Sequence, residues 1–230
     1  MTGAEILAAL QAQADPANAQ AVAAYHKVER VYLGVTVPQV EQVVKAARAE
    51  MDVPERVAAA AHLWDSDVHE ARVAAGKLLT QARIRPDDAA VWAEVQRWVP
   101  TFDAWAVADH AAAAGSRRLV ADPDRLDTVE TWTTHETLWV RRAALVFTLP
   151  WTKLRHPSSE DLAQRERILG WAESYVPDRQ WFIQKAIAWW LRDLSKHDPD
   201  RVQHFLAAHG ADMKPFAVRE ASKYLGRASA

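Results

Sequence analysis

The sequence contains no cysteine. This excludes disulfide bridges, thiolate metal ligands and a cysteine nucleophile, and with them the class of small secreted proteins that disulfides hold together. Glycine and proline are also scarce, with 7 and 11 residues among 230. Because tight hairpin turns depend on glycine, this scarcity argues against an all-β fold.

Long hydrophobic runs are missing as well. No stretch of about 18 apolar residues is present that could span a membrane. Residues 1–20 have neither the basic segment nor the apolar core of a secretion signal. The apolar fraction of 50% and the charged fraction of 25% are typical of globular proteins. We therefore expect a soluble, cytoplasmic protein with no membrane partner.

The short motifs of several enzyme classes do not occur either. The chain has no G-x-S-x-G, no H-E-x-x-H, no phosphate-binding Walker A motif and no G-x-G-x-x-G. The nine histidines are scattered, and no two are spaced as ligands on one helical face. We interpret the His-Glu dipeptides at His69 and His135 as first-turn residues of helices. We accordingly expect neither a metal ion nor a cofactor.

A repeated helix-start signal is the main feature that is present. Capping residues followed by proline or acidic residues occur near positions 52, 86, 122, 158 and 198, which are 34 to 40 residues apart. Second starts fall between them, so each repeat is two helices joined by a short turn, as in HEAT-type solenoids. We predict a single all-α, HEAT-like domain over residues 1–230, with N-terminal helices in 1–50 and about five helix pairs in 52–227. The N-terminal helices are placed at about 1–18, 18–33 and 38–49.

The second helices of the repeats carry a basic residue at a common position. On a solenoid whose second helices line the concave surface, these residues would form a basic groove for an acidic polymer. The alternative is that they pair with acidic residues of neighbouring repeats. The net charge is −2, but residues 116–230 hold 18 basic and 15 acidic residues, against 10 and 15 in residues 1–115. The basic residues in question are Arg72, Arg142, Lys185 and Arg219.

Tryptophan is unusually frequent, with 11 residues against 5 phenylalanines and 4 tyrosines. Trp105 and Asp109 are spaced i,i+4, which places them on one face of an alanine-rich helix. There the carboxylate is either a site residue or the partner of an arginine in a neighbouring repeat. Trp189 and Trp190 diverge by about 100° on a helix, so one of them should lie outside the core. Trp189 is also one turn from Lys185.

Several segments of the chain resemble the AlkD-like family of DNA alkylation repair glycosylases. They occur in order within about residues 20–209, and the last of them is the most specific. The resemblance implies a HEAT-like solenoid that holds duplex DNA in its concave face. The segments are YLGVTVP at 32–38, FDAWAVAD at 102–109, LWVRRAA at 138–144 and QKAIAWWLRDLSK at 184–196.

The resemblance also implies roles for individual residues. The family's catalytic aspartate falls on Asp109, its two tryptophans on Trp105 and Trp189, and its arginine on Arg142. Such an enzyme excises purines alkylated at N3 or N7, which carry a positive charge and leave as neutral bases. The expected partner is duplex DNA containing alkylated bases, bound by a monomer. A non-enzymatic helical-repeat scaffold that binds DNA structures or a protein is the alternative from another functional class.

Overall fold

A computed structural model describes residues 1–226, which form thirteen α-helices and no β-strand. The predicted all-α helical-repeat fold is therefore confirmed. The chain divides into two compact units, unit 1 from Met1 to Pro123 and unit 2 from Asp124 onward. The prediction of a single domain over residues 1–230 stays a prediction. Residues 227–230 lie outside the described residues, and so does the predicted end of the last helix pair at residue 227.

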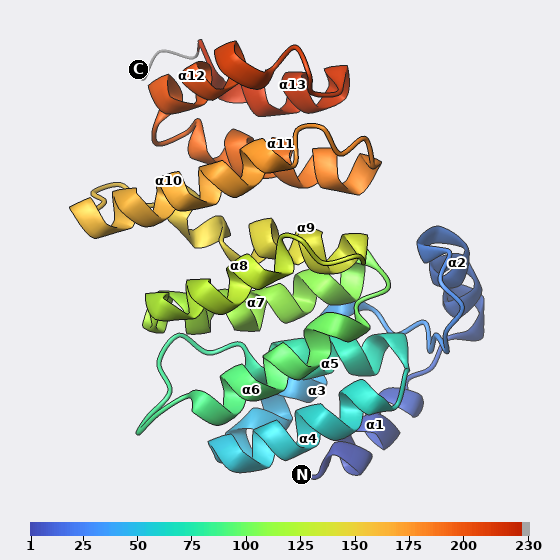
Figure 1. Cartoon of the computed structure of the whole chain (residues 1–230). Coiled ribbons are helices and arrows are strands. Elements are labelled where there is room, and N and C mark those ends of the chain that lie inside the picture. Colours follow the sequence, from blue (N-terminus) through green and yellow to red (C-terminus); the bar gives the residue numbers. More distant parts are fainter. Residues whose placement is uncertain (227–230) are drawn as a thin grey trace. The chain divides into compact units, whose positions relative to one another are not determined.

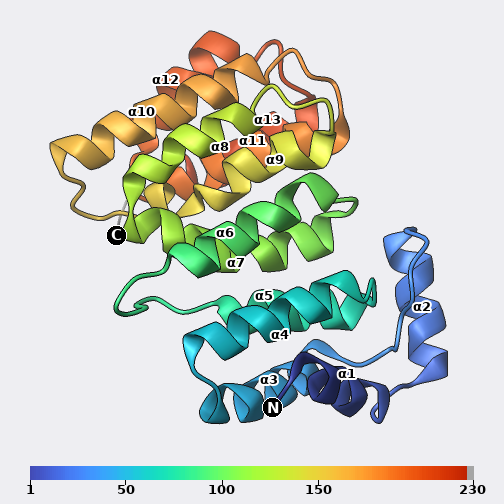
Figure 2. The same ribbon diagram turned by 60° about the horizontal axis from the view of Figure 1, so that its bottom comes forward.

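Unit 1 is a stack of helix pairs with one helix set apart. Figures 1 and 2 both show the pairs α4–α5 and α6–α7 in successive layers, while α2 stands to one side of them. The second helices of these pairs lie behind the first in Figure 1. The elements are α1 (Gly3–Gln11), α2 (Pro16–His26), α3 (Val37–Glu50), α4 (Val53–Asp65), α5 (His69–Leu79), α6 (Ala89–Trp98), the 3-10 turn η1 (Val99–Thr101) and α7 (Trp105–Ala121).

The short 3-10 turn η2 (Pro123–Arg125) spans the boundary between the units, and unit 2 continues the alternation of first and second helices. Its elements are α8 (Leu126–Trp132), α9 (Leu138–Phe147), η3 (Leu149–Thr152), α10 (Ser159–Ser174), α11 (Trp181–Leu194), α12 (Pro199–His209), α13 (Pro215–Ala221) and η4 (Ser222–Tyr224).

Side-chain caps explain why two of the first helices, α4 and α10, begin where the sequence predicts. The Asp52 carboxylate accepts a hydrogen bond from the Glu55 backbone N–H, and the Glu55 carboxylate accepts one from the Asp52 N–H, both at 2.9 Å. Ser158 closes an equivalent box with Asp161. Each box satisfies backbone donors that the first turn leaves unpaired, which fixes the start of the helix.

The first two N-terminal helices are shorter than predicted, while the third, predicted at 38–49, is confirmed as α3. Instead of helices at 1–18 and 18–33, α1 ends at Gln11 and α2 begins at Pro16. The Asp15 carboxylate accepts hydrogen bonds from the backbone N–H groups of Ala17 and Asn18, at 3.0 and 3.1 Å. Asp15 and Pro16 thus form the same cap signal that marks the later repeats, and the sequence analysis passed over it.

Two first helices begin later than their predicted starts at 86 and 122. The Asp87 carboxylate accepts a hydrogen bond from the Ala89 N–H at 3.1 Å, so α6 begins after the acidic pair rather than at its proline. The residues of η2 form a 3-10 turn, and α8 begins only at Leu126. The second helices begin at His69, Trp105, Leu138, Trp181 and Pro215.

Two glycines permit close backbone approaches in unit 1. Gly34 has a φ of +77°, and a Cβ atom there would lie 2.1 Å from the Asp15 carbonyl oxygen. Its N–H donates to the buried Glu70 carboxylate at 2.8 Å, which ties this turn to α5. Gly76 lets α5 pack directly against α7, since a Cβ atom there would lie 2.7 Å from the His110 carbonyl oxygen.

Most of the tryptophans belong to the core. The rings of Trp64 and Trp98 stack with centroids 4.5 Å apart, and their indole N–H groups donate to Thr101 and Glu94 at 3.0 and 2.7 Å. Most of the tryptophan excess therefore reflects packing of the repeats and not a binding surface. The buried tryptophans are Trp64, Trp92, Trp98, Trp132, Trp151, Trp171 and Trp190.

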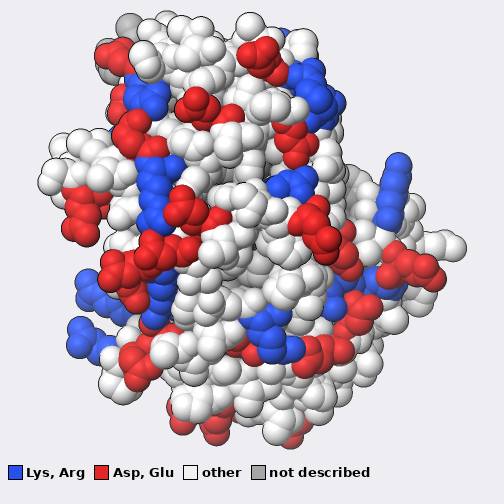
Figure 3. All heavy atoms as spheres, in the orientation of Figure 1, with Lys and Arg blue, Asp and Glu red and all other residues white. Residues whose placement is uncertain are grey.

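The first helices are linked by ion pairs within each unit. An arginine on one first helix contacts an acidic residue on the first helix of the preceding pair. In Figure 3, acidic and basic side chains alternate over α8, α10 and α12, and neither sign forms a continuous patch there. Arginines of the first helices therefore pair with neighbouring repeats, an arrangement that the sequence left open for the basic residues of the second helices. The pairs are Arg97–Asp65, Arg167–Glu130 and Arg201–Glu166.

Candidate active site

Helix α7 carries the first two candidate residues on one face. Trp105 is the first residue of α7 and Asp109 follows one turn later. Both side chains are half-buried, whereas Ala106, Val107 and Ala108 between them are buried in the core. The alanine-rich segment therefore forms the predicted helix, and its small residues bring the Trp105–Asp109 face close to the body of unit 1.

The Trp105 ring packs against aromatic side chains from α2. Its centroid lies 5.4 Å from that of His26 and 6.1 Å from that of Tyr25, whose ring is nearly perpendicular to it at 84°. His26 in turn stacks on Tyr32 and lies 4.6 Å from His69. Tyr25 is 69% exposed. Neither Tyr25 nor His26 was predicted from the sequence to lie beside Trp105.

The two imidazoles in this cluster are uncharged at neutral pH. Burial lowers the pKa of His69 to about 3, and the nearby His26 and Arg30 add to the effect. Burial is also the main cause that lowers the pKa of His26. A proton on either ring would place a positive charge in a poorly solvated setting, so the rings beside Trp105 act as neutral aromatic surfaces.

Arg72 and Arg30 share acidic partners in unit 1. The buried Arg30 guanidinium contacts Asp67 at 2.9 Å and Asp103 at 2.6 Å. Arg72 contacts Asp67 at 3.1 Å, and its guanidinium lies 5.0 Å from the centre of the Trp64 ring. The charge of Arg72 is therefore already compensated within the fold, and its predicted role in DNA binding stays a prediction.

Helix α11 of unit 2 carries Trp189, whose ring is held by a buried carboxylate. The Trp189 indole N–H donates to Asp193 at 3.2 Å. Asp193 is 7% exposed and has Lys196 at 3.3 Å, Arg192 at 3.5 Å and Lys153 at 4.0 Å. The sequence analysis missed Asp193, although it follows Trp189 by the same four residues that separate Asp109 from Trp105.

The adjacent tryptophans on α11 have different environments, as predicted. Trp190 is fully buried, whereas Trp189 is half-buried. Lys185 is exposed, and its ammonium group lies 4.9 Å from the centre of the Trp181 ring, one turn earlier on the same helix. Trp181 stacks in turn on Phe216 of α13, with ring centroids 5.5 Å apart.

The four predicted DNA-binding residues do not share one setting. Arg72 is ion-paired, while Arg142 on α9 is 3% exposed. Lys185 and Arg219 are exposed, on α11 and in the last turn of α13. A buried arginine also contributes packing, so we expect replacement of Arg142 by alanine to lower stability as well as DNA affinity. The basic concave groove stays a prediction.

Within residues 1–226, no group of three histidine, aspartate or glutamate side chains is arranged to hold a metal ion. In that same range no helix has the length and apolar character needed to cross a membrane.

The fold and these side chains define a helical-repeat protein with a tryptophan–aspartate face on α7. Residues 6–225 match the family model of the DNA alkylation repair enzymes, and the chain belongs to that family. No curated protein sequence matches it significantly.

Solved structures of related fold come from three bacteria. A predicted DNA alkylation repair enzyme from Enterococcus faecalis is 26% identical, with a TM-score of 0.75 over 94% of this chain and 98% of that one. AlkD2 from Streptococcus mutans is 20% identical, with a TM-score of 0.60 over 84% and 91%. The Pseudomonas fluorescens alkylpurine DNA glycosylase AlkC, bound to DNA containing an abasic site analogue, is 18% identical, with a TM-score of 0.53 over 82% and 53%.

Proposed function

We propose that this protein is a DNA glycosylase that hydrolyses the N-glycosidic bond of positively charged N3- or N7-alkylated purines in duplex DNA. Membership of the DNA alkylation repair enzyme family supports a role in the repair of alkylated DNA. The DNA-bound AlkC structure, of related fold, supports DNA as the partner. The observation that carries the proposal is the half-buried face of α7 on which Trp105 and Asp109 lie one turn apart.

The proposed reaction needs a negatively charged carboxylate and does not need a proton donor. An alkylated purine that carries a positive charge departs as a neutral base, so no proton has to be delivered to it. Positive charge then develops on the deoxyribose, and the Asp109 carboxylate stabilises this oxocarbenium-like state. A water molecule adds to C1′ as the bond to the base breaks, and Asp109 accepts the proton that the water loses.

Aromatic faces stabilise the same charge. A tryptophan face attracts a nearby cation by about 0.5–2 kcal/mol. Trp105 packs against both Tyr25 and His26, so its ring needs little reorganisation to meet the substrate. The neutral imidazole of His26 adds no opposing positive charge. Trp189 is proposed to supply a second face, with its indole N–H bound to Asp193.

Basic residues would hold the DNA backbone and not the lesion. We assign phosphate contacts to Arg142, Lys185, Arg72 and Arg219, since arginine and lysine bind phosphate without reading the base sequence. The exposed Lys185 and Arg219 are available for such contacts as the structure stands. Arg72 would have to exchange its contact with Asp67 for a phosphate.

A non-enzymatic helical-repeat scaffold is the second candidate function. The ion pairs that join successive first helices favour it, because they show that much of the arginine content serves the fold. In this case Asp109 would stabilise the stack of repeats and no base would be released.

Single-turnover excision separates the two candidates. The protein is incubated in excess with a duplex containing 3-methyladenine or 7-methylguanine, and the released base is measured by chromatography. The glycosylase proposal expects release from methylated duplex and none from the unmodified control. Binding of the methylated duplex without any release would overturn it in favour of the scaffold.

A further inference from the structure

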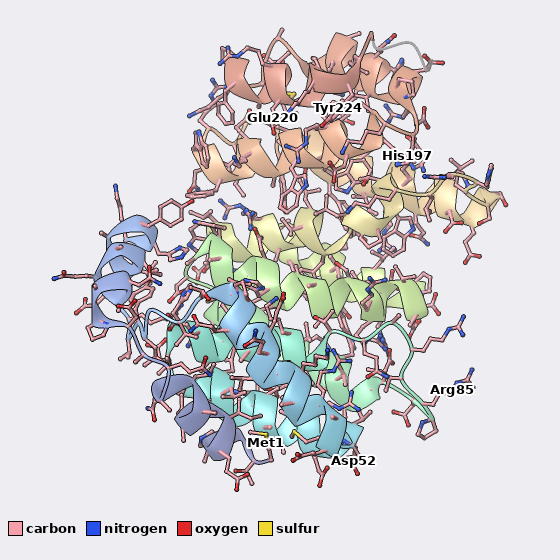
Figure 4. All side chains as sticks on the ribbon, turned by 180° about the vertical axis from the view of Figure 1, so that it is seen from behind. Met1, Asp52, Arg85, His197, Glu220 and Tyr224 are labelled. Carbon is pink, nitrogen blue, oxygen red and sulfur yellow. The ribbon has the colours of Figure 1, made fainter. Side chains whose placement is uncertain are left out.

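A groove of about 370 Å³ opens between three helices of unit 1. It lies along α3, α5 and α7, which face the viewer's side of unit 1 in Figure 4. None of its residues was singled out by the sequence analysis. The lining side chains are Glu41, Val44, Lys45 and Arg48 of α3, Lys77 and Thr80 of α5 and its cap, and His110 and Ala113 of α7.

The groove is positively charged although unit 1 as a whole is acidic. It holds three basic side chains and one carboxylate, that of Glu41. Burial, followed by the nearby Lys77, lowers the pKa of His110, which leaves this imidazole neutral. Lys45 is exposed and makes no ion pair with any described carboxylate. The groove therefore presents a net charge of about +2 at neutral pH, the sign that suits an anionic ligand.

The Arg48 guanidinium is held in place without a carboxylate partner among the described residues. It donates to the Thr80 carbonyl oxygen at 2.9 Å and to the Gln81 side-chain oxygen at 3.4 Å. Both acceptors are neutral, so they orient the fork and leave its positive charge uncompensated. A planar fork that is fixed in this way is suited to a phosphate oxygen.

Lys77 already binds an anionic group in the groove. Its ammonium nitrogen lies 2.5 Å from a carboxylate oxygen of Glu41, which is exposed. This pair shows that an anion fits at this point of the wall. It also means that a bound phosphate would compete with Glu41 for Lys77.

The groove continues the face that carries the candidate catalytic residue. Trp105, Asp109 and Ala113 are spaced i, i+4 and i+8 on α7, so they lie along one stripe of the helix. Ala113 lines the groove. His110, the residue after Asp109, also lines it, so the groove adjoins Asp109 along α7. A duplex whose damaged nucleotide lies at Asp109 would have backbone phosphates within reach of it.

We propose that this groove binds a backbone phosphate of duplex DNA through Lys45, Arg48 and Lys77, the last after it exchanges Glu41 for the phosphate. The proposal rests on the proposed function, because it takes duplex DNA as the ligand. It adds a phosphate site in unit 1, although residues 1–115 hold 15 acidic and only 10 basic residues.

The test compares three charge changes in the full chain. Lys45→Gln removes a groove cation, Glu41→Gln removes the competing carboxylate, and Arg85→Gln removes an exposed cation outside the groove. Figure 4 shows Arg85 on the loop between α5 and α6, pointing away from α3 and α7. All three side chains are exposed, and melting curves verify that the variants are folded.

Affinity for a fluorescently labelled unmodified duplex is measured between about 50 and 200 mM salt, the range over which phosphate contacts change DNA affinity strongly. We expect Lys45→Gln to weaken binding about tenfold at low salt, the effect of one charged hydrogen bond, and to reduce the salt slope by about one. Glu41→Gln should tighten binding about threefold because Lys77 loses its competitor. Arg85→Gln should leave both quantities within about twofold.

The proposal is wrong if Lys45→Gln and Glu41→Gln bind the duplex as the parent protein does, or if the parent does not bind duplex at all. Titration with inorganic phosphate provides a further arm. Phosphate binding that Lys45→Gln abolishes, with unchanged DNA affinity, would assign the groove to a free anion and overturn the DNA proposal. Base release from methylated duplex, measured on the same samples, reports separately on the glycosylase proposal.

Discussion

The same local spacing, a tryptophan followed four residues later by an aspartate, occurs on α7 and on α11 with different outcomes. On α11, Asp193 is 7% exposed, accepts the Trp189 indole N–H and lies within 4.0 Å of three cations. On α7, Asp109 is half-buried, and Trp105 packs against aromatic rings instead. Identical spacing therefore creates a structural carboxylate in one unit and a candidate catalytic one in the other.

The physical difference lies in the groups that surround each tryptophan–aspartate pair. Asp193 has Arg192 of α11, Lys196 just after α11 and Lys153 just after η3 as close neighbours, so its charge is taken up within unit 2. The imidazoles next to Trp105 are neutral, because burial lowers the pKa of His26 and of His69. The surroundings of the tryptophan, and not the spacing, indicate which pair is suited to stabilise a cationic substrate.

The largest expected effect is that of Asp109→Asn, which keeps the size of the side chain and removes its charge. We expect excision to slow on the order of 100-fold or more, or roughly 2.7 kcal/mol of transition-state stabilisation. DNA affinity should change little, since a carboxylate does not attract phosphates. Single-turnover excision of methylated duplex measures the rate, and Asp193→Asn is the matched control. Equal losses in the two variants would break the comparison between α7 and α11.

The second prediction concerns the neutral imidazoles around Trp105. Because the pKa of His69 is lowered to about 3, the folded protein binds fewer protons than the unfolded chain below pH 6.5. The stability that the neutral His69 contributes is therefore complete above pH 6.5. The free energy of unfolding then falls as the pH drops from 6.5 toward 3. At pH 5 the loss is about 2 kcal/mol. Urea unfolding at pH 7 and pH 5 measures it.

A variant isolates the contribution of His69. His69→Phe keeps a ring against Tyr32. It should reduce the difference in unfolding free energy between pH 7 and pH 5 by about 2 kcal/mol. His156→Gln, at an exposed position, should leave the difference unchanged. The neutral-cluster description fails if His69→Phe shows the same acid sensitivity as the parent.

The third prediction compares the two aromatic faces. Trp105→Ala and Trp189→Ala should each slow excision by roughly 2- to 30-fold, the equivalent of about 0.5–2 kcal/mol of cation–π attraction. Trp105→Phe should recover part of the loss, since phenylalanine retains a smaller aromatic face. Single-turnover rates on methylated duplex measure all three. A loss in either alanine variant that exceeds that of Asp109→Asn would reverse the assigned roles.

The smallest expected effect is that of Asp193 acting through Trp189. Asp193→Leu removes the acceptor of the indole N–H and should slow excision about fivefold, the equivalent of one hydrogen bond. Asp193→Asn keeps an acceptor and should retain most of the rate. With fluorinated tryptophan, the 19F signal of Trp189 should shift in the leucine variant only. An unmoved signal in both variants would show that Asp193 does not position the ring.

Much of the fold was predictable because its signals are local. Asp52 and Ser158 mark helix starts through hydrogen bonds that span three residues, so the sequence alone locates them. The same local chemistry at Asp15 was present and overlooked. The start at Ala89 was harder to predict, because two adjacent acids and a proline compete for the cap and the Asp87 side chain decides.

The candidate site was predictable only in part. The i,i+4 relation of Trp105 and Asp109 follows from helical geometry, and the resemblance supplied their roles. The neighbours of Trp105 come from α2, some 80 residues earlier in the chain, a distance over which spacing carries no information. Arg72 and Lys185 occupy the same position of the repeat, yet one is ion-paired and the other exposed.

The sequence by itself determined the helical repeat, the starts of several helices and the residues that share a helical face, because each depends on contacts within a few residues. Only the tertiary structure decided which charges are compensated. Asp193 meets Lys153, and Arg30 meets Asp103, through packing of elements that are far apart in the chain. The groove of Lys45, Arg48 and Lys77 likewise exists only where α3, α5 and α7 come together, since electrostatic interactions depend on distance in space and not along the chain.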